Sequence, residues 1–244
     1  MIVIKRWTDG EVIYTSDCNT IKEAVEEAHK NQISLQFADL KMADLKYANL
    51  PGINLRNADL QLADLRYTNL RFAYLQESNL KDTDLRYTDL KYAFLNYAFL
   101  QGTNLRETNL ENAHLRDACL QGVFLRDTYL KGADLRNADL KGASFKDADI
   151  RFADLYGADL RYADLRNAKT DFGTLKNLFY ISDIGCNNDI AEIYNTDKGI
   201  FIKCGCFQDT IEKFESQVKE TYKGSKFERD YLAMIEFIKR KFEK

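Results

Sequence analysis

The side chains best suited to nucleophilic or acid–base chemistry are few in this chain, which has two histidines and five cysteines. Catalysis needs a nucleophile or base that partner side chains hold in place. His114 stands five residues before Cys119, but we expect the two side chains to point apart, on neighbouring faces of a coil. His29 falls in a predicted helix and is expected to be a solvated surface residue. The sequence therefore predicts that the protein is not an enzyme.

A zinc site is the second chemistry to consider, because Cys186, Cys204 and Cys206 fall in the C-terminal part of the chain. One residue separates Cys204 from Cys206, whereas zinc ligands are usually spaced more widely, and no histidine lies near them. We favour small buried residues at a strand end and leave the role of the three cysteines open. The chain also has no glycine-rich phosphate loop, so we expect no metal and no cofactor.

The charge balance limits the classes of partner. The chain has 35 Lys and Arg against 38 Asp and Glu, a net charge of -3, and no segment is strongly basic. The electrostatic signature of a nucleic-acid-binding protein is therefore missing. We also find no apolar run of about 18 residues and no signal-peptide pattern, so we expect no membrane contact. The odd number of cysteines favours reduced thiols in the cytoplasm.

The dominant pattern has a period of five residues. From Leu35 to Leu165 every fifth residue is apolar, which makes 27 positions, all leucine except Phe145 and Ile150. A small or β-branched residue stands two positions earlier, Asp or Asn usually lies between, and Lys or Arg often follows. Neither a helix nor a strand returns to one face every five residues. The pattern instead predicts a coil in which each unit forms one side, with the small residue and the leucine inside.

The stretches "ADLKMADLKYANL" and "ADLRNADLKGASFKDADI" resemble pentapeptide repeat proteins. The resemblance implies a mainly β fold, a right-handed quadrilateral β-helix of about 27 repeats, with four repeats and so twenty residues in each coil. Residues twenty apart would then stack, as Tyr47 on Tyr67, and Gly102 on Gly122 at a corner suited to positive φ. Because stacked coils pair through their backbones, the end coils need covers.

Both ends depart from the repeat and predict small α+β capping modules. The N-terminal residues predict a hairpin, then a helix that starts with a capping box at Thr20. The C-terminal part predicts a hairpin with its turn at Asp197-Lys198-Gly199, then two helices. These ends loosely resemble those of phage-borne pentapeptide repeat proteins. We predict three domains: a hairpin-helix cap at 1–32, the β-helix at 33–168 and a C-terminal α+β module at 169–244.

The outward position between the small residue and the leucine turns aromatic in the middle of the repeat, as in "KYAFLNYAFL". A cluster of exposed aromatic side chains is typical of an interface. Two alternatives stay open: a terminal module folds over the cluster, or the rings form a ladder that only stabilises the stack. We predict the partner-binding residues to be Tyr74, Tyr87, Tyr92, Phe94, Tyr97, Phe99, Phe124 and Tyr129.

An acidic surface is the alternative binding site. Some pentapeptide repeat proteins resemble duplex DNA in width and charge and occupy type II topoisomerases, so the resemblance allows that role. Lys and Arg interleave with the acidic residues of this chain, which weakens the field that mimicry needs. The acidic outward positions near the end of the repeat are Asp134, Asp139, Asp149, Asp154, Asp159 and Asp164.

We predict a non-enzymatic protein whose rigid rod binds, and inhibits or shields, a macromolecular target. The resemblance suggests a phage protein directed against a host defence or DNA-acting system. A DNA mimic that modulates a type II topoisomerase is the first alternative. A sponge for a small ligand or nucleotide, with a pocket between a cap and the rod or between two protomers, is the second. The expected partner is a protein of unknown identity, with a homodimer as one option.

Overall fold

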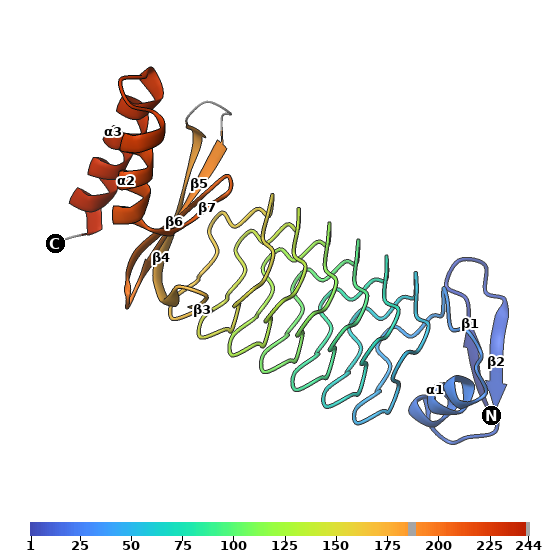
Figure 1. Ribbon diagram of the computed structural model, residues 1–244. Coiled ribbons are helices and arrows are strands. Elements are labelled where there is room, and N and C mark those ends of the chain that lie inside the picture. The colour runs from blue at the N-terminus through green and yellow to red at the C-terminus, as the bar shows by residue number, and fades with distance from the viewer. Residues whose placement is uncertain (185–188, 243–244) are drawn as a thin grey trace. The chain divides into compact units, whose positions relative to one another are not determined.

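The computed structural model describes residues 1–184 and 189–242. Its contacts divide the chain into two compact units, Met1–Asp164 and Leu165–Lys244, which we describe separately. In the first unit the chain winds through successive coils that follow an N-terminal hairpin and helix (Figure 1). The predicted mainly β, β-helix-like fold is confirmed, whereas the hand of the coil and the three domain boundaries stay predictions.

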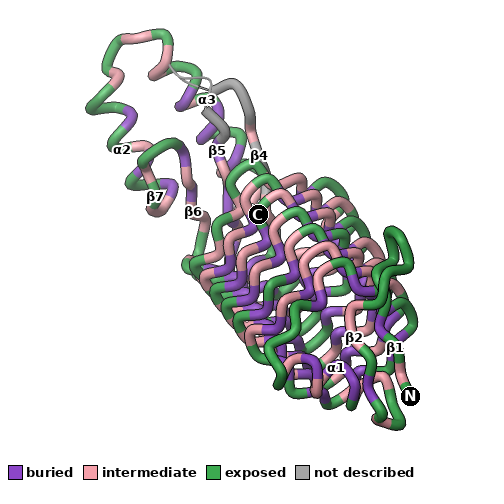
Figure 2. The backbone as a smooth tube through the Cα atoms, turned by 90° about the vertical axis from the view of Figure 1, so that its right-hand side faces the viewer, coloured by how far each residue is buried: buried purple, intermediate pink, exposed green. Residues whose placement is uncertain are grey.

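Each coil takes twenty residues. Parallel β-bridges join each outward residue to the one twenty positions later, from Asp39 and Asp59 to Ser144 and Asp164. Buried and outward positions alternate along each side of the coil, so that Ala93 and Leu95 are buried on either side of Phe94 (Figure 2). The predicted inward pair of a small residue and a leucine is therefore confirmed.

Four repeats per coil give the rod four sides, which we number by the column of outward residues that each presents. The first side presents Asn54, Tyr74, Phe94, His114, Asp134 and Asp154. The second presents Asp39, Asp59, Asn79, Phe99, Cys119, Asp139 and Asp159. The third presents Asp44, Asp64, Asp84, Asn104, Phe124, Ser144 and Asp164. The fourth presents Asn49, Asn69, Asp89, Asn109, Tyr129 and Asp149.

Hydrogen bonds between coils explain the five-residue unit. In the repeat from Leu80 to Asp84, the N–H groups of residues 80 and 82 donate to the next coil at 2.7 and 3.0 Å, and that of residue 84 donates to the preceding coil at 3.0 Å. The N–H of Thr83 closes the turn on the carbonyl oxygen of Leu80 at 3.2 Å. The fifth N–H, that of Lys81, donates to the side-chain oxygen of Asn79 at 3.3 Å. The outward Asp or Asn thus completes the hydrogen bonding of the repeat that follows it.

Every corner is a β-turn in which the second residue after the leucine has a positive φ. This holds at all 27 such positions from residue 37 to residue 167, and 21 of them are not glycine. Gly102 and Gly122 have φ of 68° and 63°, as predicted, but Tyr97 adopts 61° in the same way. A left-handed conformation costs a residue other than glycine roughly 1–2 kcal/mol. The bonds on both sides of each corner hold the chain in it.

At the N-terminus, β1 (Ile2–Lys5) and β2 (Val12–Ser16) form an antiparallel hairpin, and α1 (Ile21–Lys30) follows. Thr20 and Glu23 make the predicted capping box. The predicted hairpin and helix are therefore confirmed.

The hairpin bonds directly to the first coil. Lys5 accepts a backbone hydrogen bond from Asp39 at 2.7 Å, and Trp7 donates one to Phe37 at 3.0 Å. Leu35 and Leu40 are buried although no coil precedes them. Since the backbone of the first coil is engaged in this way, the hairpin occupies part of its open edge.

The second unit holds a five-stranded antiparallel sheet and two helices. Its strands pair in chain order and are β3 (Lys169–Thr170), β4 (Gly173–Ile184), β5 (Asp189–Thr196), β6 (Gly199–Cys204) and β7 (Phe207–Thr210). The helices are α2 (Ile211–Thr221) and α3 (Lys226–Phe242).

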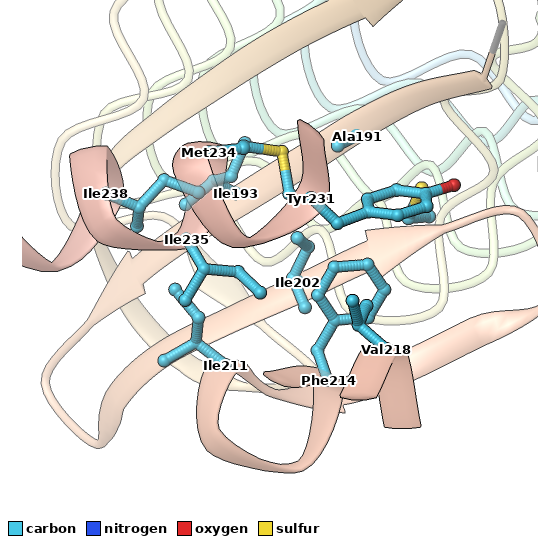
Figure 3. Packing of buried hydrophobic residues seen from close by; sticks show 11 residues of the cluster. Ala191, Ile193, Ile202, Ile211, Phe214, Val218, Tyr231, Met234, Ile235 and Ile238 are labelled. Atoms are coloured by element: carbon cyan, nitrogen blue, oxygen red, sulfur yellow. The ribbon is translucent and has the colours of Figure 1, made fainter. Parts of the chain in front are cut away.

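The predicted β5–β6 hairpin and both helices are confirmed, whereas the sequence did not indicate β4 or β7. Side chains from β5, β6, α2 and α3 form the core of the unit, with Phe214 packed edge-on against Tyr231 (Figure 3). Cys204 is part of this core, Cys206 is exposed, and Cys186 lies outside the described residues. Among the described residues, no helix is both long and apolar enough to cross a membrane.

Buried threonines give a test of the inward packing. The hydroxyl of Thr103 donates to the carbonyl oxygen of Leu80 in the preceding coil at 2.6 Å, and Val123 fills the same position one coil later. Because that position accepts valine, Thr103→Val should fold and lose about 1 kcal/mol of unfolding free energy with the hydrogen bond. Urea unfolding followed by circular dichroism measures the change. Val123→Thr is the matched control. A Thr103→Val variant as stable as the wild type would show that the hydrogen bond from Thr103 to Leu80 does not contribute to the unfolding free energy.

Candidate functional site

The twenty-residue coil distributes the eight predicted aromatic residues around the rod. Tyr74 and Phe94 lie on the first side and Phe99 on the second, and the corners flanking the first side carry Tyr92 and Tyr97. The remaining three lie elsewhere: Phe124 on the third side, Tyr129 on the fourth, and Tyr87 on the corner between those two. The expected single cluster of eight is therefore wrong, because residues five apart occupy successive sides.

One continuous group of rings remains on the first side, its two corners and the start of the second side. We call it the aromatic surface; its members are Phe72, Tyr74, Tyr92, Phe94, Tyr97 and Phe99. Phe72 stacks on Tyr92 with ring centroids 5.1 Å apart, and Tyr74 stacks on Phe94 at 5.2 Å. Tyr97 is 54% exposed and Phe99 41%, so the N-terminal helix does not cover them.

Basic side chains lie over four rings of the aromatic surface, 5.1 to 6.0 Å from the ring centroids: Arg56 over Tyr74, Arg71 over Phe72, Lys81 over Phe99 and Lys91 over Tyr92. The residues that follow its outward aromatic positions, where other repeats often carry Lys or Arg, are the amides Gln76, Asn96 and Gln101. Phe124 and Tyr129 are followed instead by Arg126 and Lys131. In sequence, the outward aromatic positions of the aromatic surface are thus followed by neutral residues, whereas those of the third and fourth sides are followed by basic ones.

The aromatic positions also give up a hydrogen bond. Where Asp or Asn occupies the outward position, its side chain accepts the N–H two residues later, as Asn79 does for Lys81. A phenyl ring offers no such acceptor, so Phe94 and Phe99 leave the N–H groups of Asn96 and Gln101 without it. Ring stacking offsets this at Phe94, which lies between Tyr74 and His114 at 5.2 and 5.0 Å.

Phe99 has no such compensation. Its neighbours in the column are Asn79 and Cys119, and no ring contact of Phe99 is found among the described residues. Lys81 places its ammonium group 5.5 Å from the ring centroid. An aromatic ladder therefore does not explain Phe99.

Two of the three predicted aromatic residues outside this surface, Tyr87 and Phe124, have partners within the rod, whereas Tyr129 is 53% exposed and has no ring contact among the described residues. Tyr87 stacks on Tyr67 at 4.8 Å and donates its hydroxyl to Glu107 at 2.8 Å, and this bond raises the pKa of Tyr87. Arg106 lies over the ring of Phe124 at 5.4 Å. A stabilising ladder accounts for Tyr87 without a partner protein.

The predicted acidic residues are dispersed and paired. Asp134 and Asp154 lie on the first side, Asp139 and Asp159 on the second, Asp164 on the third and Asp149 on the fourth. Ion pairs join Asp134 to Arg136 at 2.6 Å, Asp139 to Lys141 at 3.2 Å, Asp149 to Arg151 at 2.5 Å, Asp154 to Arg136 at 3.6 Å and Asp159 to Arg161 at 2.7 Å. The hydrogen bond from Arg136 lowers the pKa of Asp134, and that from Arg161 lowers the pKa of Asp159. Basic neighbours therefore offset much of the acidic field.

The residues considered for catalysis and metal binding are not brought together. His114 lies on the first side, in the ring column of Phe94, and Cys119 lies on the second. In the part of the chain that the structure describes, no group of three or more His, Cys, Asp or Glu side chains could hold a metal ion.

The pairing of Asp134 predicts a pH dependence. Because its folded pKa lies below the unfolded value of about 3.9, its contribution to stability is present above about pH 4 and is lost as the pH falls further. Asp134→Asn, which keeps a side chain common at this position, should lower the unfolding free energy at pH 7 by at most about 1 kcal/mol and by less at pH 3. Urea unfolding at both pH values measures this. Arg136→Gln should show the same pH trend. If Asp134→Asn lowered the unfolding free energy equally at pH 7 and pH 3, the ion pair between Asp134 and Arg136 would not contribute to stability.

Comparisons with known proteins identify the repeat. A family model described as pentapeptide repeats matches in 8 copies, over residues 38–71, 63–98, 95–132 and 128–167, more than half of the chain. No curated protein matches the chain.

Solved structures of pentapeptide repeat proteins match parts of the chain. Rfr23 from the cyanobacterium Cyanothece 51142 is 38% identical, with 40% of this chain and 60% of that chain covered and a TM-score of 0.30. HetL from Nostoc sp. strain PCC 7120, described as involved in heterocyst differentiation regulation, is 31% identical over 53% of this chain and 73% of that chain, with a TM-score of 0.23. QnrB1, a plasmid-mediated fluoroquinolone resistance protein, is 16% identical over 52% and 76%, with a TM-score of 0.36. On the strength of the repeat match, this chain belongs to the pentapeptide repeat family.

Proposed function

We propose that this protein is a non-enzymatic binding rod whose aromatic surface contacts a partner protein. The observation that carries the proposal is Phe99, together with Phe94 on the neighbouring side. At both positions the chain gives up the side-chain acceptor for the repeat that follows, and an amide follows instead of Lys or Arg. Phe99 departs from this rule without the ring stacking that offsets the loss at Phe94, and such a departure is expected at a functional site.

The chemistry of the aromatic surface suits a protein partner. Protein interfaces are enriched in Tyr, Phe and Arg, and the aromatic surface presents exposed Tyr and Phe rings with Arg56 over Tyr74 and Arg71 over Phe72. Hydrogen bonds between coils anchor its backbone on both sides, for example from Phe94 to Ala73 at 2.9 Å. Binding therefore orders little of the chain, which favours affinity.

The proposal extends to the consequence of binding. A rod held against a macromolecular target inhibits or shields it, and we propose that the target belongs to a host defence or DNA-acting system met by a phage. This part rests on the family resemblance. We place the protein in a reducing cytoplasm, because the chain has an odd number of cysteines.

The structure gives less support to the DNA-mimic alternative. A mimic needs an aligned and unbalanced acidic field, whereas these aspartates lie on four sides and five of the six named above are held in ion pairs with Arg or Lys. The aromatic surface has no counterpart on a DNA backbone.

A pull-down from bacterial lysate tests the proposal. Phe94→Asp/Phe99→Asp restores the common side chain at both positions, so the variant should fold. Phe124→Asp/Tyr129→Asp makes the same chemical change on the third and fourth sides and is the matched control. The first variant should lose the partner by about 30-fold or more, the effect of removing one interface hot spot of about 2 kcal/mol. The control should retain it.

Mass spectrometry identifies the captured protein, and urea unfolding checks each variant. Equal capture by wild type and both variants would reject the aromatic surface. Unfolding of Phe94→Asp/Phe99→Asp would show that both rings support the fold, and would also reject it. Self-capture alone, with a doubled mass in solution, would make the partner a second copy of the chain.

A further inference from the structure

A cleft lies at the N-terminal end of the second side, between the hairpin loop and the rod. Its volume is about 230 Å³, and Trp7 and Phe99 are the two aromatic residues that line it. Trp7 comes from the loop between β1 and β2, whereas Phe99 belongs to the aromatic surface. The cleft therefore joins two segments that lie far apart in the sequence.

Hydrogen bonds hold Trp7 in place. Its indole N–H donates to the carbonyl oxygen of Asn57 at 2.7 Å, and its backbone N–H donates to Phe37 at 3.0 Å. The ring is nevertheless 52% exposed. Trp7 thus offers a fixed and accessible aromatic wall.

The other wall stands two coils along the second side. Asp59, Asn79 and Phe99 follow one another in the column, and the short side chain of Asn79 lies between the two walls. Two coils span about 9.6 Å at about 4.8 Å for each step. Rings one coil apart stack at 4.8 to 5.2 Å in this rod. Phe99 therefore lies two coil steps beyond Asp59, with Asn79 in the layer between them.

The charges in the cleft indicate which kind of chemical group it can bind. Asp59 is already engaged, since it accepts from Asn79 at 3.0 Å and pairs with Lys41 at 3.4 Å. Glu77 also lines the cleft, is exposed, and makes no side-chain hydrogen bond or ion pair with the described residues. Lys81 is the one basic residue of the lining. Two carboxylates and one ammonium group disfavour a phosphate and leave Glu77 available for a cation.

We propose that this cleft binds the guanidinium group of an arginine side chain of the partner protein. A guanidinium is planar and cationic, so it can stack between aromatic rings and pair with a carboxylate in bidentate fashion, whereas a lysine ammonium is a compact point charge. Glu77 supplies the carboxylate and Trp7 and Phe99 the rings. This proposal rests on the proposed function, because it takes the arginine side chain from the partner protein that the aromatic surface binds.

Lys81 gives the proposal its sharpest consequence. Its ammonium already lies 5.5 Å from the ring centroid of Phe99, where it competes with an incoming cation. Replacing Lys81 by Gln should therefore strengthen arginine binding, whereas replacing Glu77 by Gln should weaken it. A merely structural role for the exposed Glu77 and the half-buried Lys81 would not produce opposite effects.

Trp7 is the only tryptophan of the chain, so its fluorescence reports directly on the cleft. The full chain is titrated with acetyl-Gly-Arg-Gly-amide and with the same peptide carrying citrulline, a neutral group of similar shape. We expect saturable binding of the arginine peptide with a dissociation constant of about 1 mM, and at least tenfold weaker binding of the citrulline peptide. Glu77→Gln should weaken the arginine peptide by about fivefold and Lys81→Gln should strengthen it. Phe124→Leu, on the third side, is the matched control and should change nothing.

Three results would overturn the proposal. They are no saturable change with the arginine peptide, equal binding of both peptides, or tighter binding of adenosine monophosphate than of the arginine peptide. The peptide titration can fail while Phe94→Asp/Phe99→Asp still loses the partner in the pull-down. That result would reject only the cleft and would support the aromatic surface. Arginine-peptide binding by the wild type, with the partner fully retained by Phe94→Asp/Phe99→Asp, would reject both the aromatic surface and the cleft as contacts of that partner, because Phe99 belongs to both.

Discussion

The structure of the rod depends on the hydrogen-bonding requirement of the backbone. A coil has no helical turn or long strand in which to pair its own N–H groups, so each repeat must find partners above, below and across its corner. The repeat from Leu80 to Asp84 does so with four backbone bonds and one bond to the preceding Asn79. The positive φ at every corner, including tyrosine corners, follows from the same requirement, since only that conformation closes the turn while keeping the coils in register.

The inward and outward positions of the repeat have different roles, and this difference explains which positions can carry a function. Backbone bonds and inward side chains stabilise the stack, so the outward position affects the fold through a single hydrogen bond and its contacts within the column. Repeats that follow the rule carry Asp or Asn with a basic neighbour and present paired charges, as Asp134 does with Arg136. Phe99 abandons the rule without a ring to stack on, and the cleft beside it is closed by a tryptophan from outside the repeat. Both features therefore point to the same region of the rod.

The paired charges also account for a surface that is rich in ions yet nearly neutral. Each basic side chain after a leucine can reach the outward position of its own coil or of the next one, as Lys141 reaches both Asp139 and Asp159. Where the outward residue is aromatic, the same reach places Lys81 or Arg106 over a ring instead. Among the outward aromatic residues, Tyr74, Phe94 and Phe99 are followed two positions later by an amide, whereas Phe124 and Tyr129 are followed by Arg126 and Lys131.

The sequence by itself determined the five-residue unit, the inward leucines, the twenty-residue stacking of Tyr47, Tyr67 and Tyr87, and the capping box at Thr20, because each depends on local spacing. It could not determine β4, whose sequence lacks a clear alternation of apolar and polar residues and whose backbone pairs with β5. It also misjudged the candidate site, because a linear run from Tyr74 to Tyr129 looks continuous until the coil places it on four sides. No periodicity of the sequence could predict the cleft at Trp7. The hairpin loop and Phe99, which is 92 positions later, meet only when the first coil has formed. Tertiary structure decided these features, because they arise from contacts between segments that no local pattern relates.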